Sequence, residues 1–567
     1  MGVTHGANAV SGILNIITKK SSLYKWEIAT TVQEETVGEE YAMFNKGRHI
    51  QAVKVSHTIS ENWFASVGFD RNDFRGYFDG REGKDYADTD LKRGYAWLPK
   101  QQYLGNASIN YRKGNFRAYY KFDYLNENID YFNPSVIITT NPPFGNNIYS
   151  YDKRYLTERL YHHLNLDGKL FGLHYNVSLS HQKQTRSTED FKYDLNSRTE
   201  SELTKTVNQS TEFFYSIGTV SNFFKDKIAD LQLGYEIVQS KGFAILNGEN
   251  QTFWPVSKPF NNFDFFAVSE FNISEKFSIR PGLRISFQKQ FENQYSSSLG
   301  LKYVLNNGLE LRASLGRSFR TPEFEELYSK IKFSGHNFYG NENLVPETSI
   351  SYDFNIKKNT FFKNDLKLSN TLSVAYLDVD DKIDMAFVGF ETGTSDPIYQ
   401  YINISFYKMW NVALTNQLEY KNWSLKAGAS VVGISREIGN GESTSDDKFL
   451  YGLQANGNIS YNWMKQNMQF SLFYKYNGEQ QQYVGVVEDG ESIYKLSEIE
   501  SYSFLDASMK KSFFKRQFDV TVGARNILDV TNIQQGLATG GAHTFSTDIL
   551  LGYGRSYFLK LTYNLNF

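Results

Sequence analysis

The sequence predicts an all-β chain that closes into a transmembrane barrel of about 22 antiparallel strands. Three observations support this fold class. Apolar and polar residues alternate along many segments, tight turns and long polar loops separate those segments, and aromatic residues make up 16% of a chain whose mean hydropathy is only −0.48. A chain that is rich in aromatics yet polar overall has apolar side chains that are each flanked by polar ones.

The C-terminal segment shows the alternation most clearly. From Tyr557 to Phe567 the odd positions are apolar or aromatic, whereas the even positions are mostly polar. The segment is long enough to cross a bilayer as one tilted strand, which takes about 9–11 residues. The same pattern recurs at residues 63–70, 116–124, 171–180, 309–316 and 518–525. Each of these segments is predicted to be a strand with one apolar and one hydrophilic face.

The connections between the predicted strands alternate in length. Tight turns are predicted at residues 60–62, 113–115, 167–169, 306–308 and 421–422. Long polar loops are predicted at residues 71–100, 128–151, 187–207, 241–261, 319–347, 437–448, 479–500 and 528–552. Residues 378–401 are predicted to be one long hairpin. Short turns at one end of a sheet and long loops at the other are typical of outer-membrane barrels, and pairing the hairpins in order gives about 22 strands.

The composition excludes several other classes of protein. A formal net charge of −2 gives no basic excess for binding nucleic acid, and the aromatic content excludes a disordered chain. The absence of cysteine excludes a disulfide framework and any thiolate site. The soluble alternatives fit less well, because propeller blades repeat every ~40–50 residues and sandwich strands span ~5–6.

Three stretches differ from generic barrel sequence. The first is GANAVSGILNIITK at residues 6–19, whose small residues between two glycines indicate a packed globular element. The second combines GRSFRTP at 316–322 with GNENLVPE at 340–347, and the third is GARNILD at 523–529.

In this order the stretches resemble a TonB-dependent outer-membrane receptor. The first is similar to the end of that family's plug domain, and its matching positions are Gly6, Ala9, Gly12 and Asn15. The resemblance implies the end of a plug at residues 1–21 and a receptor β-barrel at 22–567. Since the family normally has a signal peptide, a TonB-contact box and most of a plug before this segment, we expect an N-terminally truncated, Bacteroidetes-like chain.

The resemblance also implies a function and its partners. Such receptors sit in the Gram-negative outer membrane and take up a scarce nutrient, such as a ferric siderophore, haem or cobalamin, with energy from TonB. The implied partners are outer-membrane lipid, TonB through the missing plug segment, and a metal-chelate or macrocycle substrate. We expect a monomeric barrel with no nucleic-acid partner, no resident cofactor and no resident metal. The alternative is a passive porin-like or structural barrel, which would have no plug.

Ligand-binding residues are expected on two loops. His336 lies between the two mid-barrel motifs, with Tyr339 beside it and Arg320 in the first motif. Haem receptors of the family are similar in carrying a histidine there, and imidazole is a good axial ligand for haem iron. The alternative is an ordinary loop histidine.

On the earlier loop, an aromatic siderophore or a macrocycle could stack on Tyr86, Tyr95 and Trp97. An interfacial aromatic belt or packing within the loop would explain the same residues.

No enzyme is expected from this sequence. No zinc-protease, nucleophile-elbow, Walker A or dinucleotide-binding string occurs. His162 and His163 are adjacent, so on a strand they would point to opposite faces and could not share a metal ion.

Overall fold

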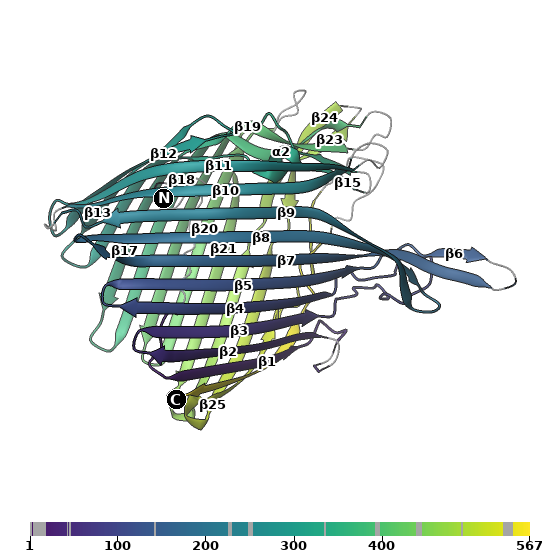
Figure 1. Cartoon of the computed structure of the whole chain (residues 1–567), viewed down its shortest axis with the longest axis horizontal. Helices are drawn as coiled ribbons and strands as arrows, with labels where there is room; N and C mark the ends of the chain where they lie inside the picture. The colour runs from purple at the N-terminus through teal and green to yellow at the C-terminus, as the bar shows by residue number, and fades with distance from the viewer. Residues whose placement is uncertain are drawn as a thin grey trace.

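The computed structural model describes residue 3 and residues 19–41, 43–44, 47–140, 143, 145–224, 229–247, 253–333, 336–391, 397–437, 445–488, 491–536 and 548–567. Within these ranges the chain forms a closed antiparallel barrel of 22 strands (Figure 1). The barrel closes where the first strand, β1 (Trp26–Glu35), pairs with the last, β29 (Ser556–Asn566). The prediction of an all-β barrel of about 22 strands is confirmed.

The other barrel strands are β2 (Arg48–Ser60), β3 (Trp63–Phe74), β4 (Lys100–Lys113), β5 (Phe116–Tyr131), β7 (Asn146–Leu170), β8 (Leu173–Asp194), β9 (Thr199–Ser221), β10 (Ala229–Asn247), β11 (Phe253–Asn272), β12 (Phe277–Gln288), β13 (Gln294–Val304), β14 (Leu309–Arg320), β17 (Glu347–Phe361), β18 (Leu366–Phe390), β19 (Pro397–Tyr420), β20 (Trp423–Arg436), β21 (Leu450–Trp463), β22 (Met468–Asn477), β25 (Tyr502–Phe513) and β26 (Phe518–Arg525).

The remaining elements lie in the connections: β6 (Ile137–Thr140), α2 (Phe324–Tyr328), β15 (Lys330–Phe333), β16 (His336–Tyr339), β23 (Gln480–Glu488), β24 (Glu491–Ile499), β27 (Asn532–Gln534), β28 (Asp548–Leu550) and two short 3₁₀ turns, η2 (Met464–Gln466) and η3 (Phe514–Arg516). No helix in the described part of the chain is long and apolar enough to cross a membrane.

The outer surface of the barrel carries the apolar residues of each strand. On β19, for example, Trp410, Val412 and Leu414 are all exposed at every second position. Aromatic pairs mark the two edges of this apolar belt. Trp423 packs against Tyr461, with ring centroids 4.6 Å apart, near the short turns, and Trp410 packs against Tyr376 at 4.5 Å towards the other edge. Such aromatic girdles sit at the two membrane–water interfaces of outer-membrane barrels.

The turn between β7 and β8 lies later than the sequence predicted. The turn residues are Phe171 and Gly172, which both have positive φ (52° and 85°), as a tight hairpin turn requires. The prediction of a turn at residues 167–169 is therefore wrong. Gly168 is a strand residue that faces Tyr175, and a Cβ on Gly168 would lie 2.6 Å from the Tyr175 hydroxyl. The glycine thus accommodates a neighbouring ring and does not mark a turn.

Two predicted loops are also wrong, because strands continue through them. β8 and β9 pair from Ser187 and Val207 up to Asp194 and Thr199, so only residues 195–198 connect them. β10 and β11 likewise extend far into residues 241–261. Above the membrane a strand needs no apolar face towards lipid, so these sections lack the alternation that reveals the lower strands. By contrast, the long hairpin predicted at residues 378–401 is confirmed by the pairing of β18 with β19.

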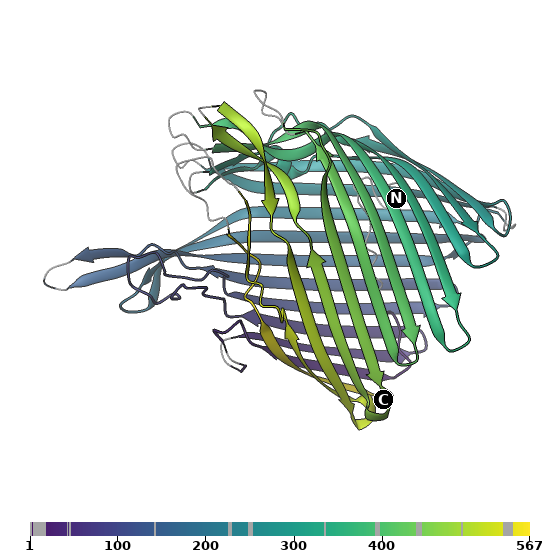
Figure 2. The same ribbon diagram turned by 180° about the vertical axis from the view of Figure 1, so that it is seen from behind.

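The long connections gather at the end opposite the short turns, and one of them projects furthest (Figure 2). β6 pairs with the upper end of β7, which continues the sheet into β8 and β9 as an arm beyond the barrel. A small apolar cluster of Val136, Phe191, Tyr193 and Leu195 holds this arm together. Short turns face the periplasm in outer-membrane barrels, so the arm lies on the extracellular side.

We expect a charge on the lipid-facing belt to destabilise the barrel, because nothing there can solvate it. Leu414→Arg should cost about 2–4 kcal/mol of unfolding free energy, measured by guanidinium titration of the chain in phospholipid vesicles. The matched control is Thr415→Arg, since Thr415 is the next residue and points to the opposite, lumen-facing side of β19. Equal losses in the two variants would contradict the assignment of the two faces.

Candidate functional site

The connection from β14 to β17 folds into a compact cap at the extracellular end of the barrel. Arg320, at the end of β14, donates hydrogen bonds to Glu326 of α2 at 3.0 Å and to Glu347 of β17 at 2.7 Å. Lys382 Nζ lies 3.1 Å from the same Glu347 carboxylate. Leu327 of α2 is buried beneath this network. The predicted site residue Arg320 therefore holds the cap in place through its own ion pairs.

The other two residues predicted on this connection lie on its small hairpin of β15 and β16. His336 begins β16, where its backbone pairs with Phe333; its side chain lies outside the described part of the structure. Tyr339 ends β16, and the Lys330 ammonium lies 5.5 Å from the centre of its ring. β16 also pairs in parallel with the upper end of β19, through Asn337 to Tyr339. The hairpin is thus tied to the barrel wall at the mouth.

The earlier loop, between β3 and β4, separates its three predicted aromatics. The Tyr86 hydroxyl donates to Asp90 at 3.0 Å, and this hydrogen bond is the main cause that raises the pKa of Tyr86 to about 12. Tyr95 stacks on Phe78 with ring centroids 4.8 Å apart, and burial raises its pKa. Trp97 remains 40% exposed beside Tyr553. Tyr95 packs within the loop, whereas Trp97 presents its ring to solvent.

A buried ion pair fixes this loop to the arm. The Arg93 guanidinium donates two hydrogen bonds of 2.7 Å to the carboxylate of Asp152 on β7, and neither side chain has any exposed surface. Arg93 also donates to the carbonyl oxygens of Lys84 at 2.7 Å and Asn133 at 2.8 Å. With all three guanidinium nitrogens engaged, the pair joins three segments into one rigid support for the mouth.

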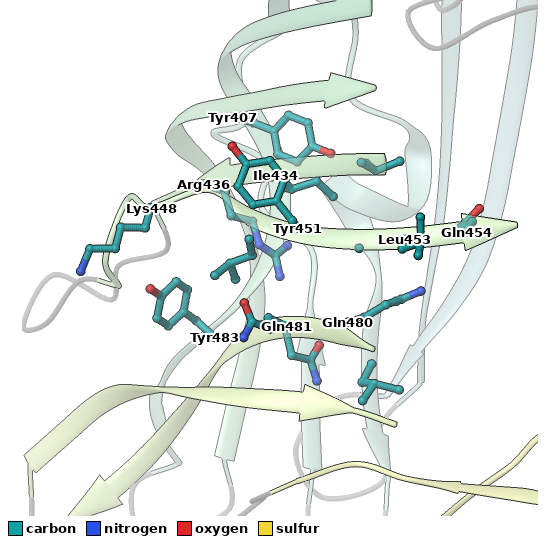
Figure 3. A pocket seen from close by; sticks show the side chains of 15 residues that line it. Tyr407, Ile434, Arg436, Lys448, Tyr451, Leu453, Gln454, Gln480, Gln481 and Tyr483 are labelled. Carbon is teal, nitrogen blue, oxygen red and sulfur yellow. The ribbon is translucent and has the colours of Figure 1, made fainter. Parts of the chain in front are cut away.

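A cavity that the sequence did not reveal lies between β19–β21 and the β23–β24 hairpin (Figure 3). This mouth cavity has a volume of about 370 Å³. Its lining combines tyrosines, glutamines, two cationic side chains and aliphatic residues: Tyr407, Tyr451, Tyr483, Gln454, Gln480, Gln481, Gln482, Arg436, Lys448, Val432, Ile434, Leu450, Gly452, Leu453 and Ile499. These residues come from strand ends that meet only in the closed barrel, and only the run of three glutamines was visible as a signal in the sequence.

The chemistry of the mouth cavity favours an anionic ligand that carries aromatic rings. No carboxylate occurs among its described lining residues. Arg436 donates to Asp384 at 2.7 Å and remains partly exposed, and Lys448 is paired with Asp446. Burial, aided by the charge of Asp446, raises the pKa of Tyr483, so its hydroxyl stays a hydrogen-bond donor at neutral pH. Tyrosine rings, amide donors and cations together suit a flat anionic chelate.

The described residues form no cluster of side chains that could hold a metal ion. No group of three or more His, Asp or Glu side chains in the described ranges could hold a metal ion. His162 packs against Phe122 with ring centroids 5.0 Å apart, whereas His163 bonds Ser180 at 2.8 Å and faces Tyr119. The two histidines therefore lie on opposite faces of β7, as predicted.

The predicted plug-end positions Gly6, Ala9, Gly12 and Asn15 lie outside the described residues. Val3 is described, and its side chain packs in the lumen against Phe266 and Val268 of β11. Arg284 donates from Nε to the Val3 carbonyl oxygen at 2.8 Å. The same guanidinium, fully buried, lies 3.1 Å from Glu236 and also pairs with Asp264. The barrel wall thus holds one residue of the N-terminal segment inside the lumen.

The strand number, the short turns at one end and the long connections at the other define a barrel of the outer-membrane type. The protein family described as TonB dependent receptor-like, beta-barrel matches residues 56–527. The chain belongs to this family of TonB-dependent receptors, as the motifs predicted. The family consists of receptors, which confirms that the chain is not an enzyme.

The relatives are known receptors and transporters. The chain is 25% identical over 312 residues to the ferric enterobactin receptor PirA of Pseudomonas aeruginosa, covering 50% of this chain and 38% of the relative. It is 26% identical over 285 residues to the vitamin B12 transporter BtuB of Vibrio vulnificus, covering 50% of this chain and 39% of that protein. The matches thus span well under half the length of these relatives.

Solved structures show the same fold over nearly the whole chain. The ferric enterobactin receptor PfeA of Pseudomonas aeruginosa superposes with a TM-score of 0.74 at 15% identity, covering 99% of this chain and 83% of that one. The siderophore receptor PirA of Acinetobacter baumannii gives 0.70 at 14% identity, covering 97% and 82%.

We expect Arg320→Ala to loosen the cap between β14 and β17. The change leaves Glu326 and Glu347 as largely buried carboxylates without their main partner, a loss of about 3–5 kcal/mol for a buried pair. Trypsin cleavage after Lys330 should become at least about fivefold faster, as measured by mass spectrometry of the folded chain. Arg312→Ala, near the other end of β14, is the control, and equal cleavage of both variants would contradict the role of Arg320.

Proposed function

We propose that the chain forms the barrel of an outer-membrane receptor that takes up an anionic metal chelate with energy from TonB. The observation that carries this proposal is the mouth cavity, with its tyrosines, amides and two cationic side chains, in a barrel of the TonB-dependent receptor family. The relatives named for ferric enterobactin and vitamin B12 support a substrate of this general kind. The proposed location is the outer membrane of a Gram-negative bacterium, with lipid around the apolar belt.

The lining favours a ferric siderophore over cobalamin. Arg436 and Lys448 are the charged residues of the described lining, and the carboxylates that pair with them, Asp384 and Asp446, lie outside it. A ferric catecholate is a compact anion with flat rings, so both its charge and its faces find partners here. Cobalamin would use the same aromatic surface without gaining from the two cations.

Within this proposal the predicted residues have different roles. Trp97 and Tyr86 on the β3–β4 loop remain proposed ligand contacts, and Tyr95 supports that loop from within. Arg320 acts as a positioning residue for the cap that carries Tyr339 and His336. Axial ligation of haem by His336 stays a prediction.

The proposed partners follow from the fold and the family. TonB would act through plug sequence that precedes the barrel, and residues 1–21 are proposed to be the end of that plug, with Gly6, Ala9, Gly12 and Asn15 as its motif. The lumen contact between Val3 and Arg284 supports a place for this segment inside the barrel. The barrel closes on itself through β1 and β29, so a monomer is the proposed state.

We expect Arg436→Ala to weaken binding of ferric enterobactin about tenfold, because one charge-assisted hydrogen bond is worth about 1.5–3 kcal/mol. Quenching of tryptophan fluorescence in the purified chain measures the dissociation constant. Tyr483→Ala should also weaken binding. Lys426→Ala removes a positive charge lower on β20 and is the matched control, expected to bind within about twofold of the unmodified chain.

The same titration distinguishes the receptor from a passive barrel. A receptor gives saturable binding of at least one of ferric enterobactin, haemin and cyanocobalamin. If none of the three binds saturably, the receptor proposal fails and a porin-like or structural barrel is favoured.

A further inference from the structure

Four basic side chains gather at the short-turn end of the barrel, on the lumen side of the wall. Arg112 and Arg117 lie opposite each other on β4 and β5, and Lys169 and His174 lie opposite each other on β7 and β8. On β5 the neighbouring positions Phe116 and Tyr120 are exposed on the outer face, so Arg117 points inwards. We call Arg112, Arg117, Lys169 and His174 the basic cluster.

The basic cluster surrounds a cavity of about 250 Å³ between two neighbouring turns. Gly114, Asn115 and Phe116 of the β4–β5 turn and Asp167 of β7 complete its lining. This cavity lies at the opposite end of the barrel from the mouth cavity and shares no residue with it.

The charges in this cavity do not cancel. Asp167 is the single acidic residue of the lining, and it is already engaged by His174 at 3.1 Å, Asn176 at 3.2 Å and Arg117 at 3.6 Å. Arg112 and Lys169 make no ion pair with any residue that the structure describes. The lining therefore carries more positive than negative charge even with His174 neutral.

A donor of the cluster is also left without a partner. Arg117 Nε is buried and has no hydrogen-bond acceptor among the described residues. A buried donor of this kind loses its bonds to water, so an oxygen ligand in the cavity would compensate for that loss. Nearby, the Lys20 ammonium lies 5.0 Å from the centre of the Tyr119 ring, and burial followed by the charge of Arg117 lowers the pKa of Lys20. Lys20 is thus a further basic residue that borders the basic cluster.

We propose that the basic cluster binds a small oxyanion of the phosphate type at the periplasmic end of the lumen. Guanidinium groups present planar sets of donors that match phosphate oxygens, and Arg112 and Arg117 occupy paired positions of β4 and β5 and both line the cavity. A volume of about 250 Å³ holds one phosphate with several waters, at about 30 Å³ for each water, and falls short of the ~300–1,000 Å³ of larger ligand pockets.

This site is independent of the proposed receptor function, because it involves the other end of the barrel. Its phosphate could come from free anion in the periplasm or from a phospholipid headgroup of the inner leaflet. The inward direction of Arg117 favours the free anion, and the experiment separates the two sources.

The test is calorimetric titration of inorganic phosphate into the purified chain in neutral detergent and chloride buffer. Saturable binding is expected, and Arg112→Gln and Lys169→Gln should each weaken it at least about fivefold. Arg280→Gln removes another basic residue near the same end, on β12, and is the matched control, expected within about twofold. Heat-modifiable migration on gels verifies that each variant is folded.

Every outcome bears on the proposal. Absence of saturable phosphate binding, or an equal loss in Arg280→Gln, would overturn the site in favour of a diffuse positive field. A repeat in nanodiscs of phosphatidylglycerol or of phosphatidylcholine assigns the source of the phosphate. If phosphate binds equally well in both lipids, the ligand is the free anion. If phosphatidylglycerol alone blocks phosphate binding, a lipid headgroup occupies the basic cluster.

Discussion

The closing contact between β1 and β29 is the constraint on which the rest of the molecule depends. In hydrocarbon, each unsatisfied backbone N–H or C=O group costs several kcal/mol, so a spanning sheet is stable only when no edge remains. The two strands pair from Glu27 with Asn566 to Glu35 with Phe558, which removes both edges at once. Strand number, the apolar belt and the division into a lumen side and a lipid side all follow from this closure.

Above the membrane, buried ion pairs fix the connections to one another, together with small apolar clusters. Arg93 with Asp152 fixes the β3–β4 loop to the arm, and Arg320 with Glu347 fixes the cap. Such pairs add little net stability because both charges are desolvated, but breaking one partner is costly. They therefore select one arrangement of the loops that they join.

The sequence was sufficient to predict the barrel because apolar and polar residues must alternate along a strand that faces lipid on one side. The same rule fails where lipid ends: residues 187–207 read as a loop although β8 and β9 continue through them. Gly168 read as a turn residue because its role depends on Tyr175, a neighbour on another strand. The mouth cavity could not be predicted from the sequence for the same reason, because Arg436, Tyr451 and Tyr483 are brought together only by strand pairing. Arg320, by contrast, was singled out by its motif.

The direction in which the chain enters β1 has a mechanical consequence. The chain reaches β1 from the short-turn end, where Lys19 lies 2.5 Å from Glu27 and Trp26 stacks on His57. A force applied from the periplasm to the segment before β1 would act along that strand. The hydrogen bonds to β2 and β29 would then be loaded together in shear and would not open one after another. The barrel can thus resist tension at its seam.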